Sequence, residues 1–249
     1  MSSLRTFLPA RRHASLSALL QHCRRPQRNS STFSHLQSEL TSRKLPLVHD
    51  YLIPTPSHLL NVALADILPQ SPSSSAARAP DRSQLPELPS TAKPTLLPPA
   101  HHIIYFPPPI PGALLLPDGT DPLQSPGEPF VRRMWAGGSV HWNNTPSEPD
   151  LRLTLDGGRV ACFESIRDVS VKGKEGEEKV FVGIERRVGR CEEGEGEHII
   201  KQRLWRDRED DFGECGVVER RNIVFMRART REQAVREMEA AKSKMMMRE

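Results

Sequence analysis

Two adjacent arginines, Arg132 and Arg133, are followed closely by Trp135 and by the glycine pair Gly137 and Gly138. Guanidinium groups bind carboxylate and phosphate groups through two parallel hydrogen bonds. Glycine lets a backbone adopt unusual dihedral angles or approach a ligand closely. These five residues are therefore candidates for binding an anionic ligand. The structural alternative is a strand with a glycine bulge, in which the tryptophan fills core.

Signatures of metal or cofactor chemistry do not occur in the sequence. The four cysteines, Cys23, Cys162, Cys191 and Cys215, are widely scattered, and none stands in a cluster with metal-ligand spacing. There is also no glycine-rich phosphate loop, Walker motif or serine nucleophile elbow. We therefore expect no metal and no cofactor, and we expect the cysteines to be ordinary reduced thiols.

The first 38 residues differ in composition from the rest of the chain. They contain six arginines and many serines, but no lysine, aspartate or glutamate. Leucines recur in them at helical spacing, without the continuous apolar stretch of a secretory signal. This composition predicts a mitochondrial transit peptide over residues 1–38, and hence a location in the mitochondrial matrix. The alternative is a disordered basic tail.

Charge and hydropathy narrow the possible function classes. Beyond residue 38, 29 basic residues stand against 31 acidic ones. This near-neutral balance argues against a general nucleic-acid-binding surface. No apolar run is long enough to cross a bilayer. We therefore expect neither a nucleic-acid partner nor a membrane span.

The part of the chain between the transit peptide and Pro149 is rich in proline. Residues 69–129 hold 16 of the 23 prolines, and residues 70–93 read as a flexible Pro/Ser-rich loop. Before this loop, Ser57–Leu68 predicts a helix that is capped by Ser57 and apolar on nearly all sides, so we expect it to be buried. After the loop, Ile103–Phe106 predicts a short strand.

Beyond Pro149 the pattern is typical of an antiparallel sheet. Alternation and turn signals predict strands at Leu151–Leu155, Val160–Val171, 180–184, Ile199–Trp205 and Val217–Met226. Residues 156–158 (Asp-Gly-Gly) predict a hairpin turn. Residues 229–249 predict a polar C-terminal helix or tail, which a capping box from Thr230 to Gln233 begins.

Several blocks of sequence resemble, in order, the fungal mitochondrial 3-hydroxyacyl-thioester dehydratases of type 2, which belong to the MaoC-like hotdog group. The blocks are Tyr51–Pro69, Leu97–Pro108, Leu114–Asp121, Pro129–Ser139, Val169–Arg187 and Val217–Ala234. The most specific parts read RRMWAGG and ERRNIVFMR. The resemblance is to the amino-terminal half of these proteins. It implies an α+β fold over residues 45–228, an N-terminal MaoC-like hotdog domain in which an antiparallel β-sheet wraps a central apolar helix.

The reaction that the resemblance implies is reversible removal of water from a 3-hydroxyacyl thioester, carried on acyl-carrier protein or CoA, in mitochondrial type II fatty acid synthesis. It requires a base, an acid and donors that stabilise an enolate. In the MaoC-like group, an aspartate and a histidine a short distance apart look like the acid–base pair. No histidine here follows an aspartate by five residues, and Glu193 before His198 lies in a glycine–glutamate loop. We therefore expect no catalytic residue in this chain, and a missing second, catalytic hotdog.

The resemblance gives the first segment a role. Arg132, Arg133 and Trp135, with Gly137 and Gly138, would line the thioester-binding cleft or an interface between hotdogs. A second hotdog domain or a homo-oligomer is the expected partner, since an unprotected sheet edge pairs readily. The alternative is a non-catalytic hotdog module that binds an acyl thioester or a protein partner.

Other chemically capable side chains read as structural. We expect His58 to be a cap or partly exposed, His101 and His102 to be structural or solvent-facing, and the arginine pairs to lie on a solvated sheet face. These residues are His58, His101, His102, Arg186, Arg187, Arg220 and Arg221.

Overall fold

The computed structural model describes residues 33–65, 67, 87–143, 148–208 and 210–246. Its contacts separate residues 1–32 from residues 33–249, and only the second unit is considered below. Most of the predicted transit peptide and most of the predicted loop over 70–93 therefore lie outside the described residues.

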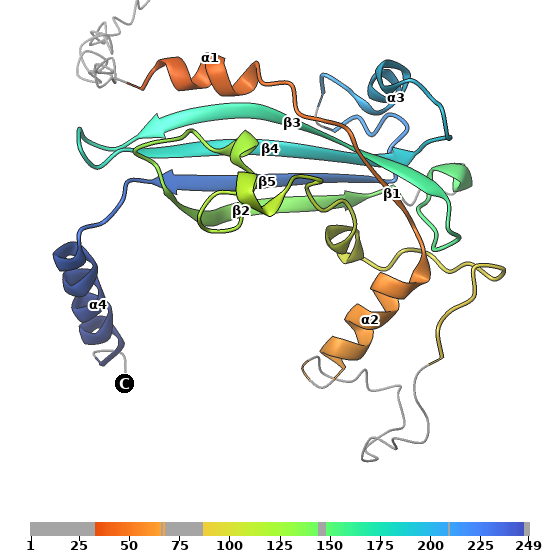
Figure 1. Cartoon of the computed structure of the whole chain (residues 1–249), viewed down its shortest axis with the longest axis horizontal. Helices are drawn as coiled ribbons and strands as arrows, with labels where there is room; N and C mark the ends of the chain where they lie inside the picture. The colour runs from red at the N-terminus through yellow and green to blue at the C-terminus, as the bar shows by residue number, and fades with distance from the viewer. Residues whose placement is uncertain (1–32, 66, 68–86, 144–147, 209, 247–249) are drawn as a thin grey trace, which may run out of the picture. The chain divides into compact units, whose positions relative to one another are not determined.

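Five antiparallel strands form one open sheet, in the order β1-β3-β4-β5-β2 (Figure 1). The strands are β1 (Val48–Tyr51), β2 (Arg132–Trp142), β3 (Arg159–Lys172), β4 (Lys179–Arg190) and β5 (Val217–Met226). The helices are α1 (His35–Thr41), α2 (Pro54–Leu64), α3 (Glu197–Leu204) and α4 (Arg231–Met246), with short 3₁₀ turns η2 (His101–Ile104), η3 (Gly112–Leu114), η4 (Pro122–Gln124) and η5 (Pro149–Leu151). This arrangement is consistent with the expected α+β, hotdog-like class.

The long strands of the second half follow the sequence pattern closely. β5 has the predicted bounds, and β3 extends the predicted strand by one residue at each end. In β4, Val180, Val182 and Ile184 are buried on one face of the sheet, as their alternation predicts. The periodicity of two therefore located these strands, but β4 continues to Arg190, beyond the predicted 180–184, because its later residues are buried on both faces of the sheet.

The predicted strand over Ile199–Trp205 is wrong, because this segment forms helix α3. Ile200 and Leu204 are four residues apart, and both are buried on one side of the helix. An acidic residue in the first turn and basic residues in the last turn complement the helix dipole. The sequence of a short segment with adjacent isoleucines is compatible with either a strand or a helix. Here tertiary packing favours the helix.

The predicted buried helix is also wrong in its bounds and in its environment. Helix α2 begins at Pro54, where a proline is favourable in the first turn, and ends at Leu64. Ser57 lies inside the helix and does not cap it. Leu59 is 59% exposed, so α2 does not lie inside the sheet as a central helix. Prolines in the preceding segment allow the helix to begin earlier than the capping signal predicted.

Two further strand predictions fail. The segment predicted at Ile103–Phe106 begins in the 3₁₀ turn η2. Within Leu151–Leu155, Thr154 makes an isolated bridge with Leu96 and no regular strand forms. The alternating leucines Leu153 and Leu155 are nevertheless buried. The alternating leucines correctly predicted which side chains are buried, but these residues lie in a loop rather than in a strand.

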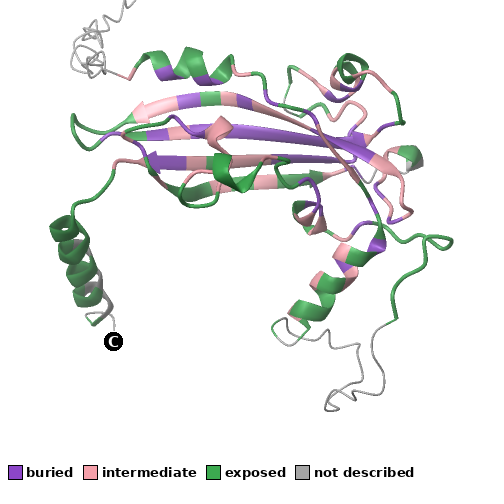
Figure 2. Ribbon diagram, viewed as in Figure 1, coloured by how far each residue is buried: buried purple, intermediate pink, exposed green. Residues whose placement is uncertain are grey.

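The two faces of the sheet are covered differently. Even-numbered residues of β4 point to what we call the covered face. There α1 packs Leu36 and Leu40 against Val182, and the segment 96–130 adds a second apolar cluster that includes Tyr105. Odd-numbered residues of β4 point to what we call the open face, where α3 packs at one end. Burial is accordingly concentrated along β3, β4 and β5 (Figure 2).

The C-terminal helix α4 begins with the predicted capping box. The Gln233 side chain accepts a hydrogen bond from the Thr230 backbone N–H at 2.9 Å, and Thr230 Oγ1 accepts one from the Gln233 N–H at 3.2 Å. Val235 and Met238, which form its thin apolar stripe, are exposed. The helix is thus fixed at its start by local hydrogen bonds, as the sequence indicates.

Candidate functional site

The predicted arginine pair lies at the start of β2, which is an edge strand of the sheet. Arg132 donates through Nε to the carbonyl of Arg227 at 3.0 Å, whereas Arg133 Nε lies 3.2 Å from Asp118 Oδ2. Successive residues of a strand point to opposite faces. The two guanidinium groups are therefore directed to different partners, and they do not form one two-pronged anion clamp.

Trp135 and the two glycines form a bulge in β2. The register with β5 shifts between Trp135 and Gly137, and Gly137 has a φ of 131°. Trp135 is 55% exposed, so it does not fill core. Its ring lies against Gly138, where a Cβ would also meet the carbonyl oxygen of Arg220. The expected strand and bulge are present, and they leave a large aromatic ring at the sheet edge.

A row of charged side chains crosses the covered face of the sheet beside this bulge. Glu164, Arg186 and Glu219 are register partners on β3, β4 and β5. Arg186 Nε lies 3.2 Å from a Glu164 oxygen, and Arg186 Nη1 lies 3.4 Å from a Glu219 oxygen. The expectation that Arg186 faces solvent is wrong, as it is for Arg187 on the other face, and both are buried. Mutual pairing offsets the cost of removing these charges from water.

His102 completes this row from the segment above the sheet. It is 1% exposed, its Nε2 lies 3.4 Å from Glu219 Oε2, and its ring makes an edge contact with Trp142. Of the two roles expected for His102, structural or solvent-facing, the structure shows the first, since the side chain lies in the core. Arg221 binds the same carboxylate at 2.7 Å and is the register partner of Gly138. The charged row thus reaches the glycine pair of β2.

The electrostatics of the row favour a fixed carboxylate. Burial opposes ionisation of Glu219, but the close approach of His102, a hydrogen bond from Arg221 and the charges of Arg221 and Arg186 outweigh it and lower its pKa to about 2. Burial raises the pKa of Glu164, with Arg186 opposing. A histidine beside an ionised carboxylate is an arrangement used in acid–base catalysis. Here it is enclosed by protein.

Sequence reasoning did not single out His102 and Glu219 as a pair. They come from a 3₁₀ turn and a distant strand, so no local spacing connects them. Cys162 on β3 is buried near the charges of this row, and burial raises its pKa to about 11, which keeps it a thiol rather than a nucleophilic thiolate. The only available signal was charge within a strand pattern, at Arg186 and Glu219, which is unusual for a buried position.

The other sequence candidates are separated from this row. Glu193 accepts a hydrogen bond from Tyr51 at 2.6 Å, consistent with a coincidental spacing to His198. His101 Nδ1 lies 2.6 Å from the hydroxyl of Ser57, a contact that ties α2 to the turn η2. Asp66, two turns after His58, lies outside the described residues.

Two kinds of feature are absent from the described part of the chain. No group of three or more histidine, cysteine or carboxylate side chains there has the arrangement of a metal site. Within the same residues, no helix is both long and apolar enough to cross a bilayer.

Comparison with known proteins shows that the part of the chain that forms most of the sheet matches a protein family. The model of the family described as hydroxyacyl-thioester dehydratase type 2 matches residues 100–249, which include β2 to β5 and His102. No curated protein matches the sequence.

Proposed function

We propose that this chain, which belongs to the hydroxyacyl-thioester dehydratase type 2 family, takes part in the dehydration of (3R)-hydroxyacyl thioesters in mitochondrial type II fatty acid synthesis. The family match carries this proposal, because it spans the four strands that build the candidate site. The family implies an acyl-thioester substrate. We further propose that acyl-carrier protein holds this substrate and that the protein works in the mitochondrial matrix, as the arginine-rich segment over residues 1–38 indicates.

The reaction makes three demands on a site. A base removes the α-proton, an acid protonates the leaving hydroxyl, and hydrogen-bond donors stabilise negative charge on the thioester oxygen. The charged row contains a histidine, His102, but this side chain and Glu219 are enclosed. In our proposal this chain supplies the amino-terminal, thioester-binding hotdog, and a second hotdog supplies the acid–base pair.

The edge strand β2 is the proposed place of contact with substrate and with the second hotdog. Arg133 and Trp135 are exposed there, and Gly137 and Gly138 leave the backbone accessible beside them. Arg132 is half-buried and steadies the strand through Arg227. An edge strand presents backbone donors and acceptors for pairing with another chain. A second copy of this chain, or a second hotdog domain, would fit that edge.

A non-catalytic module that binds an acyl thioester or a protein partner is the second candidate function. The enclosure of His102 favours it, because a general acid or base must come within hydrogen-bond reach of the substrate. The two candidates agree on thioester binding and differ on turnover.

The deciding experiment uses the purified protein with a trans-2-enoyl thioester, in the hydration direction. Loss of enoyl-thioester absorbance reports turnover, and calorimetry reports binding. Turnover supports the dehydratase, binding without turnover supports the module, and absence of both contradicts the proposed function.

Variants then test the role of β2. Arg133→Ala and Trp135→Ala are expected to weaken thioester binding several-fold, because they remove an exposed charge and an aromatic surface beside the bulge. Arg231→Ala, on the exposed start of α4, is the matched control. Unchanged binding in the two β2 variants would remove this strand from the thioester site.

A further inference from the structure

The sequence leaves open where the predicted transit peptide ends. The last arginine of the basic segment is Arg28, and the first acidic residue of the chain is Glu39. Between them, residues 29–38 contain no lysine, arginine, aspartate or glutamate. A transit peptide is marked by its arginines and its lack of acids, so charge alone is compatible with an end anywhere in this window. The structure divides the window, because helix α1 begins at His35.

Helix α1 is part of the hydrophobic core. Leu36 is 3% exposed, and Leu40, one turn later, is fully buried. Both leucines belong to the apolar cluster that contains Val180 and Val182 of β4. A chain that began after residue 38 would lack Leu36 and more than half of the helix, and it would expose apolar surface of the sheet to water.

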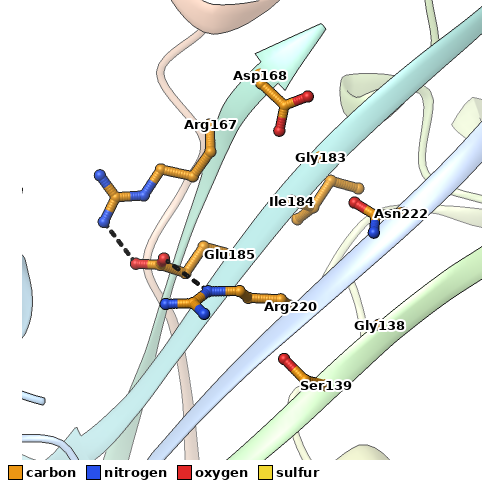
Figure 3. Close-up of a pocket in the computed structure, with 9 residues that line it drawn as sticks. All are labelled: Gly138, Ser139, Arg167, Asp168, Gly183, Ile184, Glu185, Arg220 and Asn222. Atoms are coloured by element: carbon orange, nitrogen blue, oxygen red, sulfur yellow. Dashed lines mark hydrogen bonds and ion pairs between the residues drawn. The ribbon is translucent and has the colours of Figure 1, made fainter. Parts of the chain in front are cut away.

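The covered face of the sheet needs this apolar cover, whereas the middle of the open face is stabilised by charge. On the open face, Arg167 Nη2 lies 2.6 Å from Glu185 Oε1, and Arg220 Nε lies 3.6 Å from Glu185 Oε2 (Figure 3). These charged groups stabilise one another. Val182, on the covered face of the same strand, has an apolar side chain that only apolar packing can remove from water. The helix that supplies this packing is therefore a structural requirement of the fold.

Phe33, two residues before the helix, is also held by the folded body. Its ring makes an edge contact with the ring of Phe130, with the ring centroids 4.9 Å apart. The guanidinium group of Arg227 lies 5.3 Å from the first ring and 5.7 Å from the second, within range of a cation–π interaction. Arg227 Nε donates to Glu178 Oε2 at 2.8 Å, which fixes the cation. The fold thus includes the chain from Phe33 onward.

We propose that the transit peptide is removed at a peptide bond between Arg28 and Phe33, so that the mature protein begins at one of residues 29–33 and keeps α1 whole. The proposal rests on the matrix location given in the proposed function. A processing peptidase of the matrix adds water across the bond, which leaves a carboxylate on the released peptide and a free α-amino group on the mature chain. The contacts that separate residues 1–32 from residues 33–249 support this position. A cut after residue 38, the boundary that composition predicts, would fall inside α1.

Import of the full precursor into isolated mitochondria tests the position of the cut, with uncoupled mitochondria as the control. N-terminal sequencing and the intact mass of the recovered protein are expected to give a first residue between Asn29 and Phe33. A first residue at Ser34 or later, or import without cleavage, would overturn the proposal and leave the matrix location standing. Exclusion of the precursor from the mitochondria would overturn the matrix location, and the transit peptide with it.

Matched leucine substitutions on the two sides of the proposed cut test the structural boundary without import or turnover. In the full chain, Leu36→Ala leaves a cavity in the core and is expected to lower the urea midpoint of unfolding by roughly 1 M. Leu20→Ala, the same change within the proposed transit peptide, is expected to leave the midpoint unchanged. Equal midpoints in the two variants would mean that the folded body does not depend on residues 33–38, and they would overturn the proposal.

Discussion

The imidazole Nε2 of His102 lies 3.4 Å from Oε2 of Glu219, and this contact joins the segment above the sheet to β5 near the start of that strand. Both side chains are buried. Glu219 also binds Arg221 and Arg186, so one carboxylate connects three cationic or potentially cationic groups. The covered face of the sheet is therefore held by charge at its centre and by apolar packing on either side.

Removing this carboxylate is expected to destabilise the protein strongly. Glu219→Ala removes the carboxylate that, among the described residues, pairs with Arg221 and with one side of Arg186, which costs about 3–5 kcal/mol for a buried pair. Glu193→Ala, which removes an exposed carboxylate bound to Tyr51, is the control and is expected to cost less than about 1 kcal/mol. Urea unfolding followed by circular dichroism measures both. Similar losses in the two variants would contradict a central role for Glu219.

The lowered pKa of Glu219 predicts that the stability of the protein depends on pH. The pKa of Glu219 is about 2 in the folded protein, below its ordinary value of 4.5. Its contribution is therefore fully present above pH ~4.5 and is lost as the pH falls toward ~2, by on the order of 3 kcal/mol. Glu164 acts in the opposite sense, since burial raises its pKa. Unfolding free energies at pH 7, 4 and 3 check this, and Glu219→Gln should flatten the curve.

Packing of α1 against the sheet is expected to contribute substantially. Leu40 is fully buried among residues of β3 and β4, so Leu40→Ala leaves a cavity and should cost about 2–5 kcal/mol. Leu59→Ala, on the exposed side of α2, should change stability by less than about 0.5 kcal/mol. Thermal and urea unfolding distinguish the two. Equal effects would mean that α1 is not packed as described.

Replacing either glycine of β2 by alanine is expected to perturb the structure, for a different reason at each position. Gly137 has open space around it but a φ of 131°, so Gly137→Ala costs about 1–3 kcal/mol through backbone strain. At Gly138, a Cβ meets the Trp135 ring and the backbone of β5, so Gly138→Ala should displace the tryptophan. Ala136→Gly is the neighbouring control. Tryptophan fluorescence should change in the Gly138 variant and stay near wild type in the Gly137 variant.

Periodic segments were the part of the fold that sequence reasoning could predict. β3, β4 and β5 are ten or more residues long and lie where their apolar residues predicted strands, although burial alternates only at the start of β4 and is continuous from Val182 to Gly189. Segments with short or one-sided patterns were misjudged. Ile199–Trp205 is compatible with a strand or a helix, and it lies in helix α3 because the helix buries Ile200 and Leu204 on one side. Helix α2 is apolar but exposed, because composition does not reveal what covers a helix.

The candidate site was only partly predictable, for a geometric reason. The block from Arg132 to Gly138 was found as a continuous motif and forms the expected bulged strand. The contact between His102 and Glu219 arises only after the chain folds back over the sheet. The row of Glu164, Arg186 and Glu219 likewise depends on strand register. Features assembled across strands carry no local spacing by which a sequence could reveal them.

The position of β2 at the end of the strand order has a consequence for solvent exchange. Within the described residues β2 pairs with β5 alone, whereas β4 has a strand on each side. Amide protons on the outer side of β2 are therefore expected to exchange with deuterium rapidly, while those of β4 remain protected. If two copies join through this edge, protection of the outer β2 amides will rise with protein concentration. Their exchange rates would then report self-association directly, residue by residue.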